Sequence, residues 1–484
     1  MRLRLCLFMS LLLELGALGA QPRIVTSYSD SLQDLLYKLP DTESYGDTEK
    51  AALLAEKILC ILEKNGYPFA EIRLTEQTDE GNQPFFHLQV IANHYIVWDS
   101  IVVKGDAKIS PKFLAPYLKI RKGKAYDENL VTQSSAALEA LDYVTLLRKP
   151  SPSFTTETAA LYLYLNKKNA NSFDGYIGFS SKEGRRGLQC YGHLNLQLAN
   201  SFGRGETFAV SWNRLRTNYQ TLSLEGHYPC LFQSPFGLYG QFSLLRNDTN
   251  YYRLSVPVGV SYLLKAPHYL QIHYRYESGK ITGNVSSQLQ QEDYEGHYSG
   301  LTVHLKQLDN RLMPRKGFHW ESCIEAGRKK NRETETVNLS WNGFCQGSSY
   351  LPLGGRWVQA NRLLAGYIHD KQLYESNLFL LGGLRSLRGV EEQSLRASAY
   401  FFVSEEIRFF LNNNLFVQLF ADAGWYERAL GGAYYHDFPI GLGSGFSLQT
   451  KNGIFSMSYA LAAHDNQGFK FKSAKISIGF NAFF

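Results

Sequence analysis

Apolar and polar residues alternate along most of the chain, from about residue 172 to the end. In YYRLSVPVGVSY, residues 251–262, apolar side chains share one face from Tyr252 to Val260, and Arg253 lies on the other face. This period of two predicts β-strands with one apolar and one polar face. Roughly sixteen such segments lie between 172 and 484, an even number that suits a closed antiparallel barrel.

Both a water-soluble β-sandwich and a transmembrane barrel would produce this alternation. The length of the segments, the aromatic residues at their ends and the terminal Phe484 favour a membrane all-β fold, a sixteen-stranded antiparallel barrel over residues 170–484. Closure leaves no strand edge and pairs the backbone polar groups within lipid. The residues of the apolar face that we expect to contact lipid include Leu194, Leu196, Val256 and Leu270.

The first third of the chain instead mixes helical periodicity with short strands. Residues 47–64 place apolar side chains on one helix face, with Asp47 before the helix and Gly66 after it as cap signals. Two strands follow, and then a strand, two helices and two more strands. We therefore predict two small α+β domains, at 21–96 with an incomplete start and at 97–168.

Residues 1–20, MRLRLCLFMSLLLELGALGA, begin with Arg2 and Arg4 and continue into an apolar run that ends in small residues. This pattern predicts a secretory signal peptide, although Glu14 interrupts the apolar run. No later stretch reaches about 18 apolar residues, so we expect no membrane-spanning helix. Periplasmic, secreted and outer-membrane locations all stay open at this point.

The composition also favours strands over helical bundles. The chain contains 31 Tyr, 30 Phe and 41 Gly but only 4 Met. A net charge of +6 is small for 484 residues and the basic residues are scattered, so we do not expect nucleic-acid binding. Of the six cysteines, Cys323 and Cys345 should point to opposite strand faces. We predict free thiols, although the sequence leaves open whether another pair bridges.

No motif for catalysis, nucleotide binding or metal binding is recognisable. His193, His273 and His319 fall on separate strands, and the Cys and His spacings match no metal site. The chain also contains no G-x-S-x-G elbow, P-loop or dinucleotide fingerprint. We therefore expect no enzymatic activity, no cofactor and no bound metal.

The segment LLGGLRSLRGVEEQS, residues 380–394, interrupts the strand pattern. It belongs to a long loop, residues 369–395, between the eleventh and twelfth segments. Loops of this length are usually functional or disordered, and paired glycines with few charges do not suit a solvated tether. We predict that the loop folds back into the barrel lumen. The alternative for Arg388 is an ordinary solvated loop arginine.

Within this loop, GGLRSLRGV resembles the lumen-loop motif of the BamA/TamA-type outer-membrane assembly superfamily, an Arg-Gly preceded by a hydrophobic residue and an upstream glycine pair. The matching positions are Gly382, Gly383, Leu387, Arg388, Gly389 and Val390. At Val390 the family more often has an aromatic residue. A second segment, FADAG, is similar to the family's F-x-D-x-G strand motif through Phe420, Asp422 and Gly424.

The resemblance implies that Asp422 is the partner of Arg388. Leu384, Leu387 and Val390 surround the arginine in sequence, so we expect them to shield the contact from lumen water. The alternative for Asp422 is a lumen-facing polar residue without a special partner.

Further matches extend the resemblance over nearly the whole mature chain. DNRLMPRKG at 309–317, IGLGSGFSL and GIFSMSYA are similar to strand signatures of the family. The terminal segment resembles its barrel-recognition signal, with Gly479 and Phe484 in place and Ala482 where an aromatic is usual. The two N-terminal units resemble polypeptide-transport-associated (POTRA) domains.

The resemblance implies an assembly or insertion factor of the bacterial outer membrane with its N-terminal domains in the periplasm, and two such domains suit an accessory or specialised paralogue. Its implied partners are unfolded outer-membrane or secreted polypeptides, outer-membrane lipid and other assembly-machine subunits, with no nucleic acid. Substrate strands would add to exposed sheet edges by β-augmentation, and the strand near 158–165 is our candidate position for crosslinking them. A two-partner-secretion transporter and a passive porin are the alternatives. The sequence does not identify the substrate.

Overall fold

A computed structural model describes residues 23–29, 32–36, 43–45, 48–78, 84–181, 188–216, 219–247, 251–282, 292–384, 386–450, 452–465 and 468–483. The predicted signal peptide at 1–20, Asp47 and Phe484 lie outside these ranges. The chain divides into two compact units, Met1–Ser100 with Lys122–Asn129 and Ser153–Ala160, and Ile101–Arg121 with Leu130–Pro152 and Leu161–Phe484. Within the described ranges, no helix combines the length and apolar character needed to cross a bilayer.

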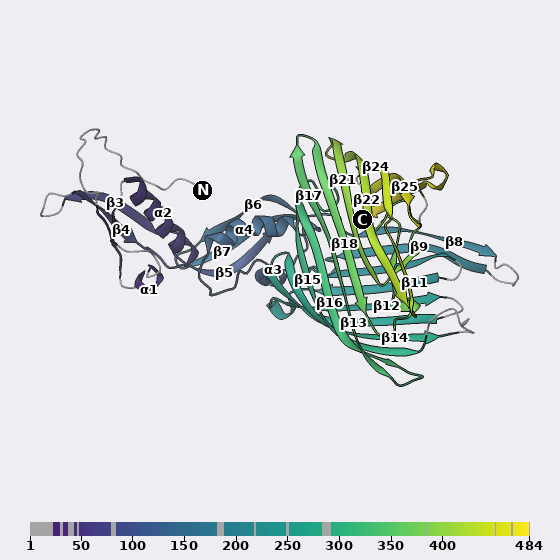
Figure 1. Ribbon diagram of the computed structural model, residues 1–484. Helices are drawn as coiled ribbons and strands as arrows, with labels where there is room; N and C mark the ends of the chain where they lie inside the picture. The colour runs from purple at the N-terminus through teal and green to yellow at the C-terminus, as the bar shows by residue number, and fades with distance from the viewer. Residues whose placement is uncertain are drawn as a thin grey trace. The chain divides into compact units, whose positions relative to one another are not determined.

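The first α+β region is a four-stranded sheet with one long helix packed on it (Figure 1). Its elements are β1 (Arg23–Ser27), α1 (Gln33–Leu36), β2 (Glu43–Tyr45), α2 (Thr48–Lys64), β3 (Glu71–Thr78) and β4 (Pro84–Ile91). The strand order is β2-β1-β4-β3, and β1 runs parallel to β4. Helix α2 buries Ala51, Ala55, Ile58 and Leu62 at the predicted helical spacing. Gly66, at φ +96°, follows its end.

The second α+β region contains the predicted strand, two helices and two strands. Its elements are β5 (Val97–Lys104), α3 (Pro111–Tyr117), α4 (Glu128–Glu139), β6 (Val144–Phe154) and β7 (Thr158–Lys167). The strand order is β5-β7-β6. Strand β7 buries Ala159, Leu161, Leu163 and Leu165 completely. The strand near 158–165, our candidate position for crosslinking, is therefore central in this sheet, and the edges open to an added strand are β5 and β6.

The remaining chain forms a closed antiparallel barrel in which neighbours in sequence are neighbours in the sheet (Figure 1). Its strands are β8 (Ser172–Ser181), β9 (Leu188–Ala199), β10 (Thr207–Arg216), β11 (Tyr219–Tyr228), β12 (Phe236–Asn247), β13 (Tyr251–Lys265), β14 (His268–Ile281), β15 (Tyr294–Leu308), β16 (Gly317–Asn331), β17 (Val337–Gly354), β18 (Trp357–His369), β21 (Ala399–Asn412), β22 (Leu415–Leu430), β23 (Ala433–Asp437), β24 (Ile440–Thr450), β25 (Gly453–Ala463) and β26 (Lys475–Phe483). Because β23 and β24 both pair with β22 and count as one interrupted strand, the described segments form the predicted sixteen strands.

Two short 3-10 turns, η2 (Leu231–Gln233) and η4 (Phe471–Ser473), lie in connections between barrel strands. The predicted loop at 369–395 is slightly displaced, since β18 ends at His369 and β21 begins at Ala399. It contains η3 (Glu375–Asn377) and a small hairpin of β19 (Phe379–Leu381) and β20 (Leu395–Ala397). It connects the eleventh and twelfth barrel strands, as predicted, and we call residues 370–398 the lumen loop.

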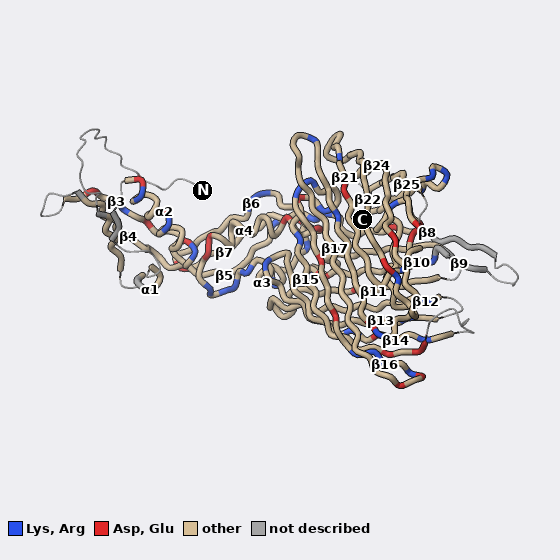
Figure 2. The backbone as a smooth tube through the Cα atoms, viewed as in Figure 1, with Lys and Arg blue, Asp and Glu red and all other residues tan. Residues whose placement is uncertain are grey.

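The alternation along the barrel strands divides the residues between two faces. On β14, Ile272 is 63% exposed and Tyr274 45%, whereas Gln271 and His273, which alternate with them, are buried. Acidic and basic positions are interspersed along the chain (Figure 2). Cys323 is buried on the inward face of β16, and the register pairs it with Phe344, so that Cys345 lies on the outward face. The prediction that these two cysteines point to opposite faces is confirmed.

The ring is weakly paired at one place, where the first strand meets the last. Strands β8 and β9 share ten register pairs, and β25 and β26 share eight. Between β26 and β8, the described residues form two pairs, Ala482 with Phe173 and Phe483 with Ser172. We call this junction the seam.

The face assignment predicts which side chains reach lipid. Spin labels at Leu194, Leu196, Val256 and Leu270 should be relaxed by lipid-soluble oxygen, because all four lie on the outward face. A label at Asn195, which points inward toward Ser211, should respond to a water-soluble nickel reagent instead. The reverse pattern would contradict the assignment.

Candidate functional site

The lumen loop lies inside the barrel, because inward-facing residues from many strands between β13 and β25 contact it. Arg253 of β13 donates to the Ser376 carbonyl oxygen. The side-chain amide of Asn377 donates to the hydroxyl oxygen of Tyr294 of β15 at 2.8 Å. Further along the ring, Arg362 of β18 donates to the Leu384 carbonyl oxygen. No single outer surface of a barrel could present these partners together, so the predicted placement in the lumen agrees with the structure.

Arg388 is the most strongly held residue of the loop. Its Nε and Nη2 atoms donate to the two carboxylate oxygens of Asp422 at 2.8 and 2.5 Å, and its backbone N–H donates to the same group at 2.9 Å. Its guanidinium also stacks on the Phe420 ring, 3.6 Å from the centroid. The side chains of Arg388 and Asp422 are 6% and 0% exposed. The structure thus brings together the loop motif and the strand motif in a planar two-point contact that suits arginine.

The network extends to residues that the sequence analysis did not single out. The third guanidinium nitrogen of Arg388 donates to Glu406 of β21 at 2.5 Å, and Arg408 donates to the other oxygen of Glu406. Arg362 reaches Ser404 at 3.0 Å. The alternation along β21 could have predicted that these side chains face the lumen, because residues 404, 406 and 408 share one face of the strand. Nothing in the local sequence, however, indicates which inward carboxylate meets which arginine.

Glycines allow the loop to approach the wall. Gly389 has φ +90°, and a Cβ built on it would lie 2.7 Å from the Leu461 carbonyl carbon and 2.8 Å from the Ala462 nitrogen of β25. Gly382 and Gly383 also have positive φ, at +105° and +89°. In β22, a Cβ at Gly424 would lie 2.3 Å from the Phe402 ring. The motif glycines are therefore required by backbone conformation or by close contact.

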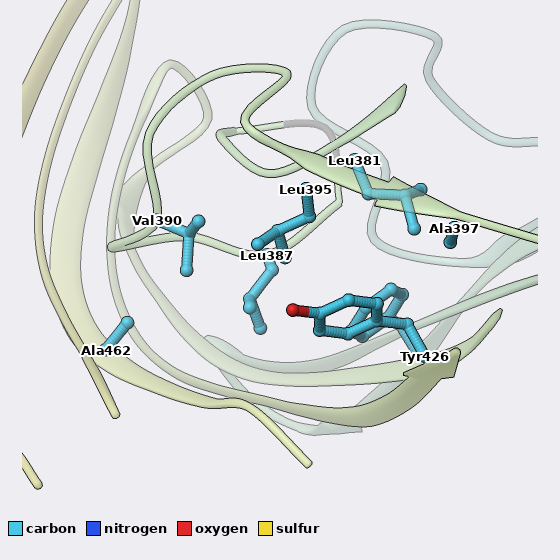
Figure 3. Close-up of a cluster of buried hydrophobic side chains, with 8 residues drawn as sticks. Leu381, Leu387, Val390, Leu395, Ala397, Tyr426 and Ala462 are labelled. Carbon is cyan, nitrogen blue, oxygen red and sulfur yellow. The ribbon is translucent and has the colours of Figure 1, made fainter. Parts of the chain in front are cut away.

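An apolar cluster shields the arginine on one side. Leu387 and Val390 are buried with the loop residues Leu381, Leu395 and Ala397, and they pack on Phe402, Tyr426 and Ala462 of the wall (Figure 3). Leu384, by contrast, is 47% exposed. The expectation that Leu384 shields the contact is therefore wrong, because Leu384 is held through its backbone, whose carbonyl oxygen accepts from Arg362 and whose N–H donates to Glu392, while its side chain stays exposed.

A second anchor fixes the beginning of the loop. Glu375 is buried and accepts from Arg396 at 3.1 Å and from Arg428 of β22 at 2.8 Å. Lys329 of β16 donates to Asp370 at 2.8 Å, and both side chains are only 2% exposed. The loop is thus held by buried charges at two places, which we call the Arg388 anchor and the Glu375 anchor.

A cavity of about 560 Å³ lies beside the Arg388 anchor. Its lining includes Gly389 and Val390 of the loop, Tyr426 of β22, Ala462 of β25 and Lys475 of β26. The space therefore adjoins both the loop motif and the last strand of the barrel.

The terminal signal residues lie apart from this network. Gly479 lies in β26, and a Cβ built on it would have no neighbour within 4 Å. Phe484, the other signal residue, lies outside the described residues. The role that the sequence assigns to them stays a prediction.

Comparison with known proteins gives the class of this protein. Residues 200–481 match the Omp85 superfamily domain, more than half of the chain. The chain therefore belongs to the Omp85 superfamily, whose barrels lie in the outer membrane, and the resemblance to the BamA/TamA-type superfamily is confirmed at this level. No curated protein matches the chain.

Solved structures share the fold at low sequence identity. CdiB from Acinetobacter baumannii is 14% identical with a TM-score of 0.62, covering 99% of this chain and 93% of that one. CdiB from Escherichia coli is 14% identical with a TM-score of 0.61 and the same coverage. BamA from Haemophilus ducreyi lacking POTRA domains 1–3 is 16% identical with a TM-score of 0.49, covering 96% of this chain and 99% of that one.

The Arg388 anchor predicts strong coupling between its two central residues. Arg388→Ala and Asp422→Ala should each lower the free energy of unfolding by about 3–5 kcal/mol, because each leaves a buried charge without its partner. The double variant should be little worse than either single variant. Urea unfolding of the barrel refolded in phospholipid measures all three. Strictly additive losses would show that the residues act independently.

An exposed ion pair provides the control for this cycle. Arg332 pairs with Glu295, and its side chain is 40% exposed. It directly follows β16 and is not part of the lumen loop. Arg332→Ala should leave the unfolding midpoint close to that of the unchanged protein.

Proposed function

We propose that this protein is an assembly factor that inserts other polypeptides into the outer membrane, with its N-terminal regions in the periplasm. The observation that carries this proposal is the seam, where the described residues of β26 and β8 form two register pairs. A strand edge with so few partners offers N–H and C=O groups to an incoming strand. In lipid those groups must find partners, so strand addition at the seam is strongly favoured.

The N-terminal regions supply further edges. We assign them as POTRA-like domains, because each combines helices with a small sheet whose outer strands have one free side. Strand β3 lies at the edge of the first sheet with Glu71, Arg73 and most of its other residues exposed. Strand β6 is an edge of the second sheet. A substrate strand can add to such an edge through backbone hydrogen bonds with little demand on its sequence.

The proposed activity is not enzymatic. Folding of the substrate into lipid supplies the free energy, through burial of apolar surface and closure of backbone hydrogen bonds. No nucleotide, cofactor or covalent step is part of the proposal. Other assembly-machine subunits and outer-membrane lipid are the remaining proposed partners.

A two-partner-secretion transporter is the second candidate, favoured by the fold shared with CdiB over 99% of the chain. In that case the substrate would pass through the lumen, and the lumen loop would have to leave it. Residues 23–27 form a strand of the first sheet, so they do not serve as a plug helix. A passive porin is disfavoured because the two buried anchors hold the loop within the lumen.

Locking the seam tests the proposed function. Cysteines introduced by Phe173→Cys and Ala482→Cys face each other in register and should form a disulfide across the seam. Liposomes containing the purified protein should accelerate folding of a urea-unfolded outer-membrane protein, followed by gel mobility. The oxidised lock should abolish the acceleration, and a reductant should restore it.

A lock within an intact part of the wall is the matched control. Ser458→Cys and Ser477→Cys join β25 to β26, where the register pairs them directly, and this lock should leave the activity unchanged. Full activity of the oxidised seam lock would contradict insertion through the seam. Recovery of substrate inside the liposomes with that lock in place would favour the transporter.

The last residues of the chain should matter for the protein's own insertion. Deletion of Phe483 and Phe484 removes one of the two seam pairs, together with the terminal aromatic residue of the proposed signal. The truncated chain should accumulate in the periplasm, as measured by fractionation of cells. Normal yield in the outer membrane would count against a terminal signal.

A further inference from the structure

A cluster of three metal-binding residue types lies on the lumen face of the barrel wall, apart from both loop anchors. His273 of β14 and Cys323 and Glu325 of β16 each direct one donor atom so that all three atoms lie within 4.8 Å of one another. The side chains of His273 and Glu325 are 4% and 9% exposed, and Cys323 is buried. Imidazole, thiolate and carboxylate are the three ligand types that zinc takes in proteins.

The register explains how residues fifty positions apart meet. His273 and Glu325 are both opposite Gly300 of the intervening strand β15. Because Gly300 has no side chain, His273 Nε2 reaches across to Glu325 at 2.7 Å. A Cβ built on Gly300 would lie 2.6 Å from His273 Nε2 and 2.7 Å from Glu325 Cγ. The wall thus leaves a space at this point that any other residue would fill.

One ring nitrogen of the cluster has no partner in the part of the protein that the structure describes. Within the described residues, the buried Nδ1 atom of His273 has no hydrogen-bond partner. Two carboxylates, Glu277 and Glu325, share one guanidinium, that of Arg275.

Arg275 would orient the ligand without displacing a metal ion. Its Nη2 and Nε atoms lie 2.7 and 2.9 Å from Glu325 Oε2, and Nε also lies 3.1 Å from the other oxygen, Oε1, whose shortest contact is with His273 at 2.7 Å. Ligating carboxylates are commonly held by hydrogen bonds of this kind from a second shell. The ion would take the place of the proton between His273 Nε2 and Glu325 Oε1.

We propose that His273, Cys323 and Glu325 bind one Zn²⁺ ion, which staples β14 to β16 across β15. Binding releases the thiol proton of Cys323, and the proton on His273 Nε2 moves to Nδ1. Cys60, Cys230, Cys323 and Cys345 are free thiols, and Cys345 lies on the opposite face, so the Cys323 thiol is available for the metal.

The site is connected to the lumen loop through the same hydrogen-bonded residues. Arg275 pairs with Glu277, and Glu277 accepts from Asn377 of the loop at 3.2 Å and from Tyr294 at 2.9 Å. Zinc would therefore rigidify the part of the wall on which the loop begins.

Metal binding to the purified full chain in detergent tests this proposal. After treatment with a chelator, the protein should take up one Zn²⁺ per chain, and Co²⁺ in its place should give a thiolate-to-cobalt charge-transfer band. Cys323→Ser should abolish that band, and His273→Gln should weaken zinc binding roughly 10–100-fold. Cys345→Ser, which removes an outward thiol, should leave both measurements unchanged.

A glycine variant separates the ligands from the space they need. Gly300→Ala keeps all three ligands but fills the gap, so zinc binding should weaken by at least about tenfold. Gly240→Ala is the control, because a Cβ there has no neighbour within 4 Å. Circular dichroism checks that each variant is folded. Equal zinc affinity in folded Cys323→Ser and unchanged protein, or no uptake by the unchanged protein, would overturn the proposal.

Discussion

The buried guanidinium of Arg388 is the constraint on which the lumen loop depends. A charge that is 6% exposed is tolerated only when paired and hydrogen-bonded, and here the partners come from two adjacent strands. Asp422 accepts two hydrogen bonds from the side chain of Arg388 and one from its backbone N–H, and Glu406 accepts from the third guanidinium nitrogen. The guanidinium is planar, and the backbone N–H of Arg388 bonds to the same carboxylate. The loop therefore fits at only one position along β22.

The same contact also specifies strand register. A slip of one residue in β22 would turn Asp422 toward lipid and bring Ala421 or Ala423 inward. That slip would leave Arg388 unpaired in the lumen and place a carboxylate in the bilayer, and both changes are costly. The Glu375 anchor acts in the same way through Arg428 of β22. Polar pairing inside the barrel therefore reinforces the register that the outward apolar face requires.

Local periodicity predicted the features that depend on neighbours in sequence. The barrel start at residue 172, the face of Cys323 and the helix at 48–64 all follow from periods of 2 or 3.6. The Arg388 and Asp422 pair came from motif resemblance. Glu406, the exposure of Leu384 and the meeting of His273 with Glu325 across Gly300 could not be predicted, because each depends on how distant strands are staggered. The central place of β7 was missed for the same reason.

The buried charges of the two loop anchors pair with strands other than the two that meet at the seam, and this has a physical consequence. The loop as a whole takes its hydrogen bonds and ion pairs from β13 to β16 and from β18, β21 and β22. The seam is held by two register pairs. Parting β26 from β8 therefore leaves these buried charges paired. In the proposed function, strand addition at the seam would therefore leave the loop and the strands that hold it in place.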